Sequence, residues 1–440
     1  MSLSVLEAAR EAPGALALVL GSDRLTFAEL AERARRRMGE LTDSPRAPLP
    51  VLATADLSAL VTVYACLELR RPLVPIHARL PAEERDRRAA EGAAFKPVGP
   101  PGGEPLAFVY SSGTQGRPRA VELSRRAFVA AAAASAERLG WRDDDRWLLA
   151  LSFAHVGGLS ILVRCLLARR PVVVATGEGF SPAGILELLG RERVSLCSLV
   201  PTQLDRLLDE GSGAPPPSLR LVLLGGAAAS RSLLERARAR GWPVATTYGL
   251  TESCAQVATQ RPGGGESGVG TPLQGVEVRL VEGRIEIRSP ASMTAYHPGG
   301  LLPPRTADGF LPTGDLGRWE PDGSLAVLGR GDDLIVTGGE NVMPGEVEAA
   351  LDGCPSVAAA CVFGLADPLW GQLVAAAIVP RGGDRDAAAL ARALRERLAP
   401  FQRPRRIAWF DELPLGPTGK LDRRAAARLA TGRLEPLAYD

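Results

Sequence analysis

The stretch Tyr110-Ser-Ser-Gly-Thr-Gln-Gly-Arg-Pro-Arg-Ala-Val-Glu-Leu-Ser124 decides how the rest of the chain is interpreted. The apolar run 106–110 predicts a short buried strand, and an alanine-rich helix is expected to begin near Ser124. Between them, glycines let the backbone approach an anion closely, and hydroxyls and free amides supply hydrogen-bond donors. Arg117 and Arg119 add positive charge. This combination suits a polyphosphate; a flexible Ser/Gly turn is the alternative interpretation.

The stretch is not a Walker loop, because no Gly-Lys-Ser/Thr follows its glycines. The chain has 440 residues, of which 46% are apolar, so two or three domains with a large core are expected. Its 52 basic and 50 acidic side chains leave a net charge of +2, which argues against binding of nucleic acid or an anionic membrane.

The six cysteines are scattered, mostly inside apolar runs, and the chain has only three histidines. No pair of cysteines has CxxC spacing, so a zinc site is not expected, and buried reduced thiols are the default in a cytoplasmic protein. The N-terminus lacks a signal-peptide pattern, and no uncharged stretch is long enough to span a bilayer. We therefore expect a cytoplasmic protein without a membrane span.

Strand and helix patterns alternate along the first 250 residues. Strands are expected at 15–20, 50–54, 72–76, 106–110, 146–151, 171–175, 195–200 and 219–224. Helices are expected at 26–34, 58–68, 125–139, after Gly158, and at 203–208. This rhythm predicts an α/β fold whose mostly parallel sheet is covered by helices on both faces.

The pattern changes in the last 175 residues. Residues 266–330 predict antiparallel hairpins at 277–281 and 283–288, as in a small barrel-like region. After Asp332 a new αβ rhythm runs to the end. We therefore expect a large N-terminal domain of residues 1–330 and a small α+β C-terminal domain of residues 331–440.

Two glycine stretches follow expected strands. Residues 152–158 place His155 in a glycine turn, where the alternative is a turn histidine that caps a helix. Residues 224–228 (Leu-Gly-Gly-Ala-Ala) lie at the carboxyl end of a buried strand. Open α/β sheets place ligands there, although a plain strand-to-helix turn is equally compatible with the pattern.

Two further stretches carry acidic residues. In Thr246–Glu252, Tyr248 has the chemistry to stack on a base and Glu252 the chemistry to hold Mg²⁺ on a phosphate oxygen. The alternative is a core tyrosine beside a solvated glutamate. In Thr313-Gly-Asp315, the carboxylate suits a ribose diol, or an Asx-type turn in a hairpin.

The last two stretches lie at and beyond the expected domain junction. Residues 329–346 join a flexible Gly/Asp segment to an apolar strand and a glycine loop. Pro414–Lys420 places a lysine on a Gly/Pro turn in a chain that is poor in lysine. Solvated surface is the alternative for this lysine.

Together and in this order, these stretches resemble the adenylate-forming superfamily of acyl- and aryl-CoA ligases, firefly luciferases and peptide-synthetase adenylation domains. The resemblance spans nearly the whole chain, because residues 25–30 and 74–80 also fit its N-terminal region. Within the superfamily, the short length and four stretches are most similar to the o-succinylbenzoate–CoA ligases of menaquinone synthesis. Those stretches are His155–Gly158, Thr251–Gln256, Gly338–Asn341 and Asp367–Gln372.

The resemblance implies an ATP-dependent ligase that joins an aryl carboxylate to coenzyme A through an acyl-AMP intermediate, with Mg²⁺, ATP and CoA as co-substrates. It implies ATP contacts from Ser111, Ser112, Gly113, Thr114, Gly116, Arg119, Gly226, Thr247, Tyr248, Gly249, Asp315 and Arg330. It implies catalytic roles for Lys420, Thr251, Glu252 and His155, with the metal at Glu252 and Thr114.

The resemblance also implies an acyl pocket formed by His155, Val156, Gly157, Gly225, Ala227, Ala228 and Ser253. A second carboxylate on the acid would need a partner, for which the candidates are His155, Ser160 and Arg164. The family rotates its small domain between half-reactions, which implies a hinge at Asp332 and a loop on the CoA side at Gly338 and Gly339. Many relatives form dimers, so a homodimer stays open.

Two departures from the family pattern concern the phosphate loop. Arg119-Ala120 stands where Lys-Gly is usual, and Gln115 stands where Thr is commoner. Arginine keeps the charge but changes the reach and geometry, so the details of pyrophosphate handling are in question. Three alternatives remain: a benzoate- or anthranilate-type aryl-CoA ligase of a secondary-metabolite pathway, an adenylation domain that loads a carrier protein, and a catalytically silent nucleotide-binding regulator.

Overall fold

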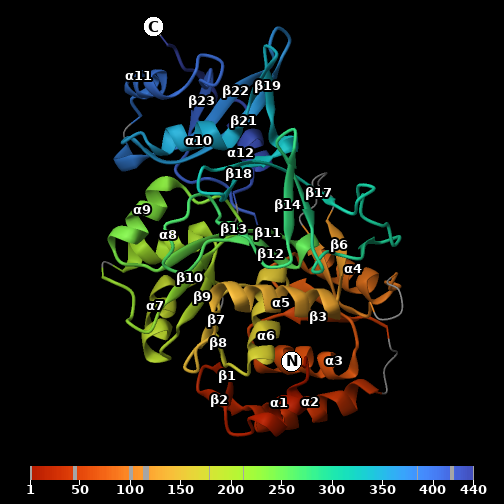
Figure 1. Ribbon diagram of the computed structural model, residues 1–440. Helices are drawn as coiled ribbons and strands as arrows, with labels where there is room; N and C mark the ends of the chain where they lie inside the picture. The colour runs from red at the N-terminus through yellow and green to blue at the C-terminus, as the bar shows by residue number, and fades with distance from the viewer. Residues whose placement is uncertain are drawn as a thin grey trace.

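The structure is a computed structural model of the chain that describes residues 2–42, 47–98, 103–111, 118–177, 179–211, 213–383, 385–416 and 421–439. Figure 1 shows a large body, which contains the first three quarters of the chain, and a smaller lobe above it that holds the C-terminal strands and helices. This is the α/β fold class that the sequence predicts. None of the helices in the described ranges is long and apolar enough to cross a membrane.

The largest sheet of the described chain has nine strands, and neighbouring strands are mostly parallel in its centre. In spatial order it contains β13 (Thr271–Pro272), β12 (Ala255–Thr259), β11 (Val244–Leu250), β10 (Leu221–Leu224), β9 (Leu196–Leu199), β7 (Trp147–Leu149), β8 (Val172–Val174), β1 (Leu16–Leu20) and β2 (Asp23–Thr26). Antiparallel strands complete both edges.

A second sheet lies beside the first and carries the phosphate-loop stretch. Its described strands are β16 (Ala295–His297), β6 (Arg119–Ser124), β5 (Pro105–Ser111), β4 (Leu73–His77) and β3 (Leu49–Ala53). Strands β3 to β5 are parallel, whereas β5, β6 and β16 are antiparallel. Residues 112–117, the tip between β5 and β6, lie outside the described residues.

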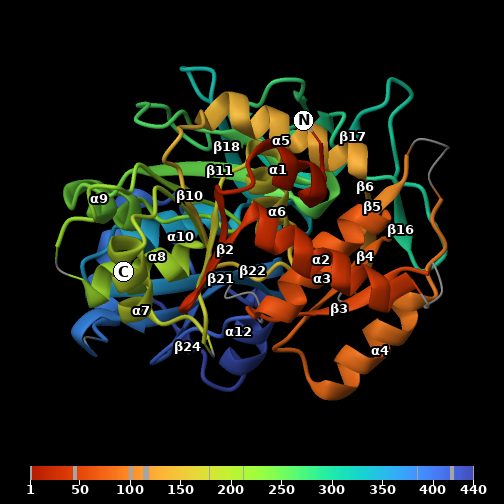
Figure 2. The same ribbon diagram turned by 90° about the horizontal axis from the view of Figure 1, so that it is seen from below.

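Helices cover both faces of the nine-stranded sheet, as the strand and helix rhythm predicts (Figures 1 and 2). One core packs the first sheet against helices of the second and includes the almost entirely buried helix α6. Another core packs three helices on the opposite face. The helices of the body are α1 (Val5–Glu11), α2 (Phe27–Thr42), α3 (Leu57–Leu69), α4 (Ala82–Ala93), α5 (Arg125–Leu139), α6 (Val156–Ala168), α7 (Pro182–Arg191), α8 (Pro201–Glu210) and α9 (Arg231–Ala239).

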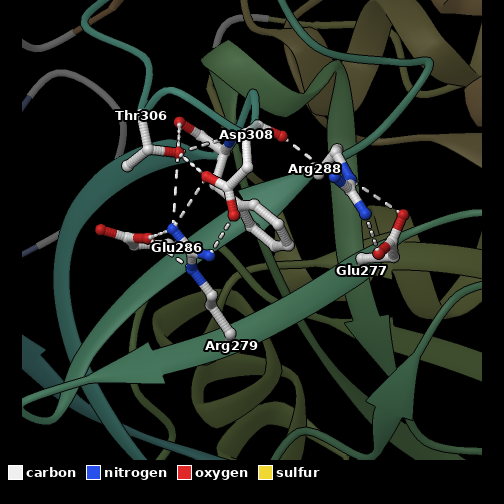
Figure 3. A network of polar contacts seen from close by, with 7 residues as sticks. Glu277, Arg279, Glu286, Arg288, Thr306 and Asp308 are labelled. Carbon is white, nitrogen blue, oxygen red and sulfur yellow. Dashed lines mark hydrogen bonds and ion pairs between the residues drawn. The ribbon is translucent and has the colours of Figure 1, made fainter.

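The predicted hairpins form a separate antiparallel sheet of four strands within the described residues. Its strands are β14 (Glu277–Val281), β15 (Arg284–Arg288), β17 (Leu311–Trp319) and β18 (Leu325–Arg330). A polar network fixes one face (Figure 3): Arg279 bonds Glu286 at 2.7 Å and Asp308 at 2.5 Å, and Arg288 bonds Glu277 at 2.5 Å. Both guanidinium groups also lie over the Phe310 ring.

The C-terminal lobe has its own sheet and its own cores. Its strands are β19 (Ile335–Thr337), β20 (Glu340–Val342), β21 (Val357–Asp367), β22 (Gly371–Pro380), β23 (Arg406–Trp409) and β24 (Glu435–Pro436). Its helices are α10 (Pro344–Asp352), α11 (Ala387–Arg397) and α12 (Arg423–Ala430). The backbone N–H and hydroxyl of Ser232, at the start of α9, donate to the carboxylate of Asp352 at 3.0 and 2.6 Å, which ties the lobe to the body.

Several elements differ from their sequence-based predictions: α2 is longer than the predicted 26–34, no helix was predicted at α1, α4, α7 or α9, and two elements next to the site also differ. Strand β6 lies where a loop was expected between the strand at 106–110 and the helix near Ser124; its Glu122 carboxylate is fully buried and lies 2.8 Å from Nε2 of His297. Helix α6 begins at Val156 rather than after Gly158. A Cβ at Gly158 would lie 2.4 Å from the Ser152 carbonyl oxygen, so the glycine is needed for close packing of the first turn.

All six cysteines are buried and free of disulfides, which confirms the expectation of reduced thiols. Burial raises the pKa of the Cys66 thiol to about 12. A thiol with so high a pKa stays protonated at neutral pH and is a poor nucleophile.

A buried ion pair at the C-terminal end of α5 provides a test of the fold's stability. Asp145 is fully buried, and its carboxylate accepts hydrogen bonds from Arg220, Ser195 and the Arg142 amide at 2.5 to 2.8 Å. Burial alone would raise the pKa of Asp145, but these donors hold it below its ordinary value. The stabilisation is therefore present above the unfolded-state pKa and is lost as the pH falls through the folded-state pKa.

We predict that Asp145→Asn lowers the free energy of unfolding at pH 7 by roughly 3 kcal/mol, because Arg220 loses its buried counter-ion. The difference from wild type should shrink below about pH 4, where the carboxylate becomes protonated. Urea denaturation across pH 3–7 measures both effects. Asp143→Asn is the matched control, because Asp143 pairs with Arg170 on the surface, and equal losses in the two variants would contradict the prediction.

Candidate active site

The carboxyl ends of β10 and β11 place two predicted stretches side by side. Gly225 and Gly226 follow β10, and Thr247 to Gly249 lie in the adjacent strand β11. A Cβ at Gly225 would approach Cγ2 of Thr247 to 2.6 Å, so the two backbones can pack together only because residue 225 is glycine. Open α/β folds bind ligands at the carboxyl ends of their parallel strands, which is where these two stretches lie.

Two side chains converge on the buried carboxylate of Asp315 beside these strand ends. The Tyr248 hydroxyl donates to Asp315 Oδ2 at 2.6 Å, and Arg330 Nη1 donates to Asp315 Oδ1 at 3.0 Å. Asp315 and Arg330 are cross-strand neighbours on β17 and β18. Three residues that the sequence places far apart are thus joined in one cluster.

The electrostatics of this cluster follow from its burial. Burial raises the pKa of Asp315, while Arg330 and the Tyr248 hydroxyl oppose that rise. Burial and the neighbouring Asp315 carboxylate raise the pKa of Tyr248 well above its ordinary value, so its hydroxyl remains a donor at neutral pH. A carboxylate has about four lone-pair positions, and two donors leave room for a further one. The cluster is therefore suited to accept hydrogen bonds from a diol.

Glu252 lies in the short 3₁₀ turn η1 (Thr251–Ser253), directly after β11. Its Oε1 accepts a hydrogen bond from the Tyr296 hydroxyl at 3.1 Å. The turn contacts β5 and β6, the two strands between which the phosphate loop runs. Glu252 therefore lies next to the two strands that lead into and out of that loop.

The phosphate loop itself is only partly described. Ser111 ends β5, its hydroxyl donates to the Arg119 carbonyl oxygen at 3.3 Å, and Arg119 is exposed at the start of β6. The predicted loop residues Ser112, Gly113, Thr114 and Gly116 and the predicted catalytic Lys420 lie outside the described residues.

The predicted acyl pocket contains residues in different environments. His155 precedes the first turn of α6, and its ring lies 5.2 Å from the ring of His77, at the end of β4. Ala227 and Ala228 are exposed after β10. Ser253 is buried, and its hydroxyl bonds the Leu250 carbonyl oxygen at 3.0 Å, so it stabilises the η1 turn. Val156 is buried and Gly157 is half-buried in the first turn of α6.

The predicted hinge and glycine loop lie beyond the body's last strand. Asp332 is exposed in the 3₁₀ turn η2 (Gly331–Asp333), between β18 of the body and β19 of the lobe. Gly338 and Gly339 form the turn between β19 and β20 with φ of 59° and 87°, which a two-residue hairpin favours. Figure 1 places β19 in the upper lobe, away from the body.

Sequence reasoning missed two side chains near the site. Tyr296 contacts Glu252 and His77 contacts His155, and neither had been given a role. The low number of these residue types could have drawn attention to both side chains, because the chain has only five tyrosines and three histidines. The pairings themselves could not be read from the sequence, since Tyr296 and Glu252 are 44 residues apart and meet through sheet topology.

Fold and site together define a nucleotide-binding α/β enzyme with a separate C-terminal lobe. The AMP-binding enzyme family matches residues 85–297, and the C-terminal domain of AMP-binding enzymes matches residues 346–420. The 2-succinylbenzoate–CoA ligase of Bacillus licheniformis is 31% identical over 463 aligned positions, which cover 93% of this chain and 96% of the relative. The chain therefore belongs to the AMP-binding, adenylate-forming enzymes.

Solved structures agree with this assignment. The o-succinylbenzoate CoA synthetase of Bacillus subtilis in complex with its acyl-adenylate intermediate has a TM-score of 0.86 and 29% identity over 96% of this chain and 97% of that chain. The same synthetase in complex with ATP and a magnesium ion has a TM-score of 0.84 and 28% identity, over 96% of this chain and 98% of that one. The resemblance to the o-succinylbenzoate–CoA ligases is thus confirmed along nearly the whole chain.

The buried Tyr248–Asp315 bond can be tested by its coupling energy. Tyr248→Phe removes a donor from a buried carboxylate, so we predict a loss of about 1–2 kcal/mol in the free energy of unfolding. The same substitution in an Asp315→Asn background should cost less, because the carboxylate is already gone. Urea denaturation of the four proteins measures the coupling, and fully additive losses would contradict the bond.

Proposed function

We propose that this chain is an ATP-dependent acid–thiol ligase that joins 2-succinylbenzoate to coenzyme A through an acyl-AMP intermediate. The observation that carries the proposal is the full-length similarity to 2-succinylbenzoate–CoA ligases, combined with an intact Tyr248–Asp315–Arg330 cluster beside Glu252. Nothing in this combination favours an adenylation domain that loads a carrier protein.

In the first half-reaction, a carboxylate oxygen of the acid attacks the α-phosphorus of ATP and pyrophosphate leaves. Both reactants are anions, so positioning and electrostatic stabilisation supply most of the rate. We assign the β- and γ-phosphates to Ser111, Ser112, Gly113, Thr114, Gly116 and Arg119. We assign adenine to Gly226, Thr247, Tyr248 and Gly249, the ribose to Asp315 and Arg330, and the α-phosphate to Thr251.

Glu252 fits a magnesium site of the kind found with nucleotides. No group of three or more His, Cys, Asp or Glu side chains among the described residues is placed to enclose a metal. Mg²⁺ in nucleotide sites instead takes one or two carboxylates together with substrate phosphates and water. Glu252, next to the phosphate loop, supplies one such carboxylate. When bound, Mg²⁺ neutralises phosphate charge, and Thr114 is the second proposed protein ligand.

In the second half-reaction, the CoA sulfur attacks the acyl carbon and AMP leaves. We propose that the C-terminal domain, residues 331–440, rotates about Asp332 between the half-reactions. Exposed Asp332 in a glycine-flanked turn can absorb a large φ/ψ change. Rotation would break the Ser232–Asp352 contact, withdraw Lys420 and bring the Gly338–Gly339 loop towards the adenylate.

Arg164 is the proposed partner of the second carboxylate of the acid. It is 4% exposed on α6, and its Nε and Nη2 have no hydrogen-bond partner among the described residues. Its guanidinium lies 5.4 Å from the Trp147 ring, and burial lowers its pKa to about 10. Of the other candidates, Ser160 already donates to the Val156 carbonyl oxygen. A carboxylate would supply the counter-ion that this buried cation lacks.

The first experiment is pyrophosphate release with 2-succinylbenzoate, benzoate and anthranilate. We predict that wild type prefers 2-succinylbenzoate by at least about tenfold in kcat/KM, because only this acid offers Arg164 a second carboxylate. Arg164→Met should reduce that preference about tenfold or more, and Arg191→Met, on the surface of α7, should not. Equal rates with benzoate would favour the benzoate-type ligase, and no release with any acid would favour the silent regulator.

If the C-terminal domain takes a different position in each half-reaction, substitution of Lys420 should impair the first half-reaction and spare the second. Lys420 is assigned to bridge the attacking carboxylate and the α-phosphate, so Lys420→Ala should reduce pyrophosphate release at least about 100-fold. The same variant should convert supplied acyl-AMP and CoA to thioester at close to the wild-type rate. Single-turnover assays of each half-reaction measure this, and an equal loss in both would overturn the assignment.

A further inference from the structure

Tyr296 occupies a position between the two charged groups at the base of the phosphate loop. Its hydroxyl donates to Glu252 Oε1 at 3.1 Å, and the guanidinium carbon of Arg119 lies 5.7 Å from its ring centroid. The side chain is half-buried, and its hydroxyl donates to the carboxylate, which can only accept when it is ionised.

The backbone around Tyr296 is fixed on both sides. On one side, the Met293 amide donates to the Glu252 carbonyl oxygen at 2.8 Å. On the other, strand β16 pairs with β6, where Tyr296 lies opposite Val121. The hydroxyl of Tyr296 is therefore held at a preset distance from Glu252.

The next residue locks the register of this short strand. Successive strand residues point to opposite faces, and His297 turns away from Glu252 towards buried Glu122, whose Oε2 lies 2.8 Å from its Nε2. The His297 ring also packs against Phe95 and Phe108. A slip of one residue would exchange the two side chains and place the histidine beside Glu252.

We propose that Tyr296 is a positioning residue for Glu252: its hydroxyl binds one carboxylate oxygen and thereby directs the other towards a nucleotide-bound Mg²⁺. This inference rests on the proposed function, which places Mg²⁺ at Glu252. Mg²⁺ demands near-ideal octahedral geometry, so a carboxylate that rotates freely is a poor ligand. Hydrogen bonds to a ligating carboxylate fix its orientation, and their loss typically costs 10–100-fold in metal affinity or activity.

The test measures metal binding without turnover. Mn²⁺ is titrated into the full-length protein with α,β-methylene-ATP, which cannot release pyrophosphate, and free Mn²⁺ is measured by electron paramagnetic resonance. Tyr296→Phe should weaken Mn²⁺ binding about tenfold, because it removes only the hydroxyl that holds Glu252. Affinity for the nucleotide analogue in EDTA should stay at the wild-type value. Tyr439→Phe is the matched control, since its hydroxyl bonds the Pro404 carbonyl oxygen in the C-terminal lobe.

Two outcomes would overturn the inference. Wild-type Mn²⁺ affinity in Tyr296→Phe would show that the hydroxyl does not orient the ligand. An equal loss of nucleotide affinity in EDTA would show that the residue only supports the local structure.

Glu252→Gln separates this inference from the proposed function. If Glu252→Gln weakens Mn²⁺ binding and Tyr296→Phe does not, only the role of Tyr296 fails. If neither substitution weakens it, the assignment of Mg²⁺ to Glu252 fails, and the inference fails with it.

Discussion

A buried carboxylate, Asp315, joins two sheets that belong to different parts of the body. Tyr248 reaches it from β11 of the nine-stranded sheet, whereas Asp315 and Arg330 come from the four-stranded sheet. An ionised group in this environment is tolerated only with donors on its oxygens, and Tyr248 and Arg330 supply these donors where the two sheets meet. The adenosine part of the proposed ATP site is therefore built into the packing of the body, and Arg330 ends the last strand before the lobe begins.

The phosphate part of the site depends on a second set of contacts between sheets. Turn η1 leaves the nine-stranded sheet and meets β5 and β6 of the five-stranded sheet, and β16 closes the edge with Tyr296 towards Glu252. Both halves of the site thus form where separate sheets converge. Each sheet supplies rigid strand ends, and the functional side chains lie on the short turns between them, which is how α/β enzymes combine a stable scaffold with a variable site.

Much of the fold was accessible from the sequence because its signals are local. The strand and helix rhythm predicted helices on both faces of a mostly parallel sheet, and the hairpins at 277–288 were recognised from their alternation. Predictions failed where a local rule was overridden by a tertiary contact. Strand β6 was missed in a stretch interpreted as loop, where buried Glu122 meets His297, 175 residues away, and the predicted start of α6 was too late because its first turn needs glycine at 158 for close packing.

The sequence by itself determined the family, the alternation of strands and helices in the body and most residue types of the proposed ATP site. These depend on periodicity and on short motifs, which are properties of neighbouring residues. Only the tertiary structure decided which side chains meet: Tyr248 with Asp315, Tyr296 with Glu252, His77 with His155, and Ser232 with Asp352. The members of these pairs are separated by 44 to 120 residues in the sequence. Whether they meet depends on strand order and on the packing of sheets, and the pattern of neighbouring residues does not specify either.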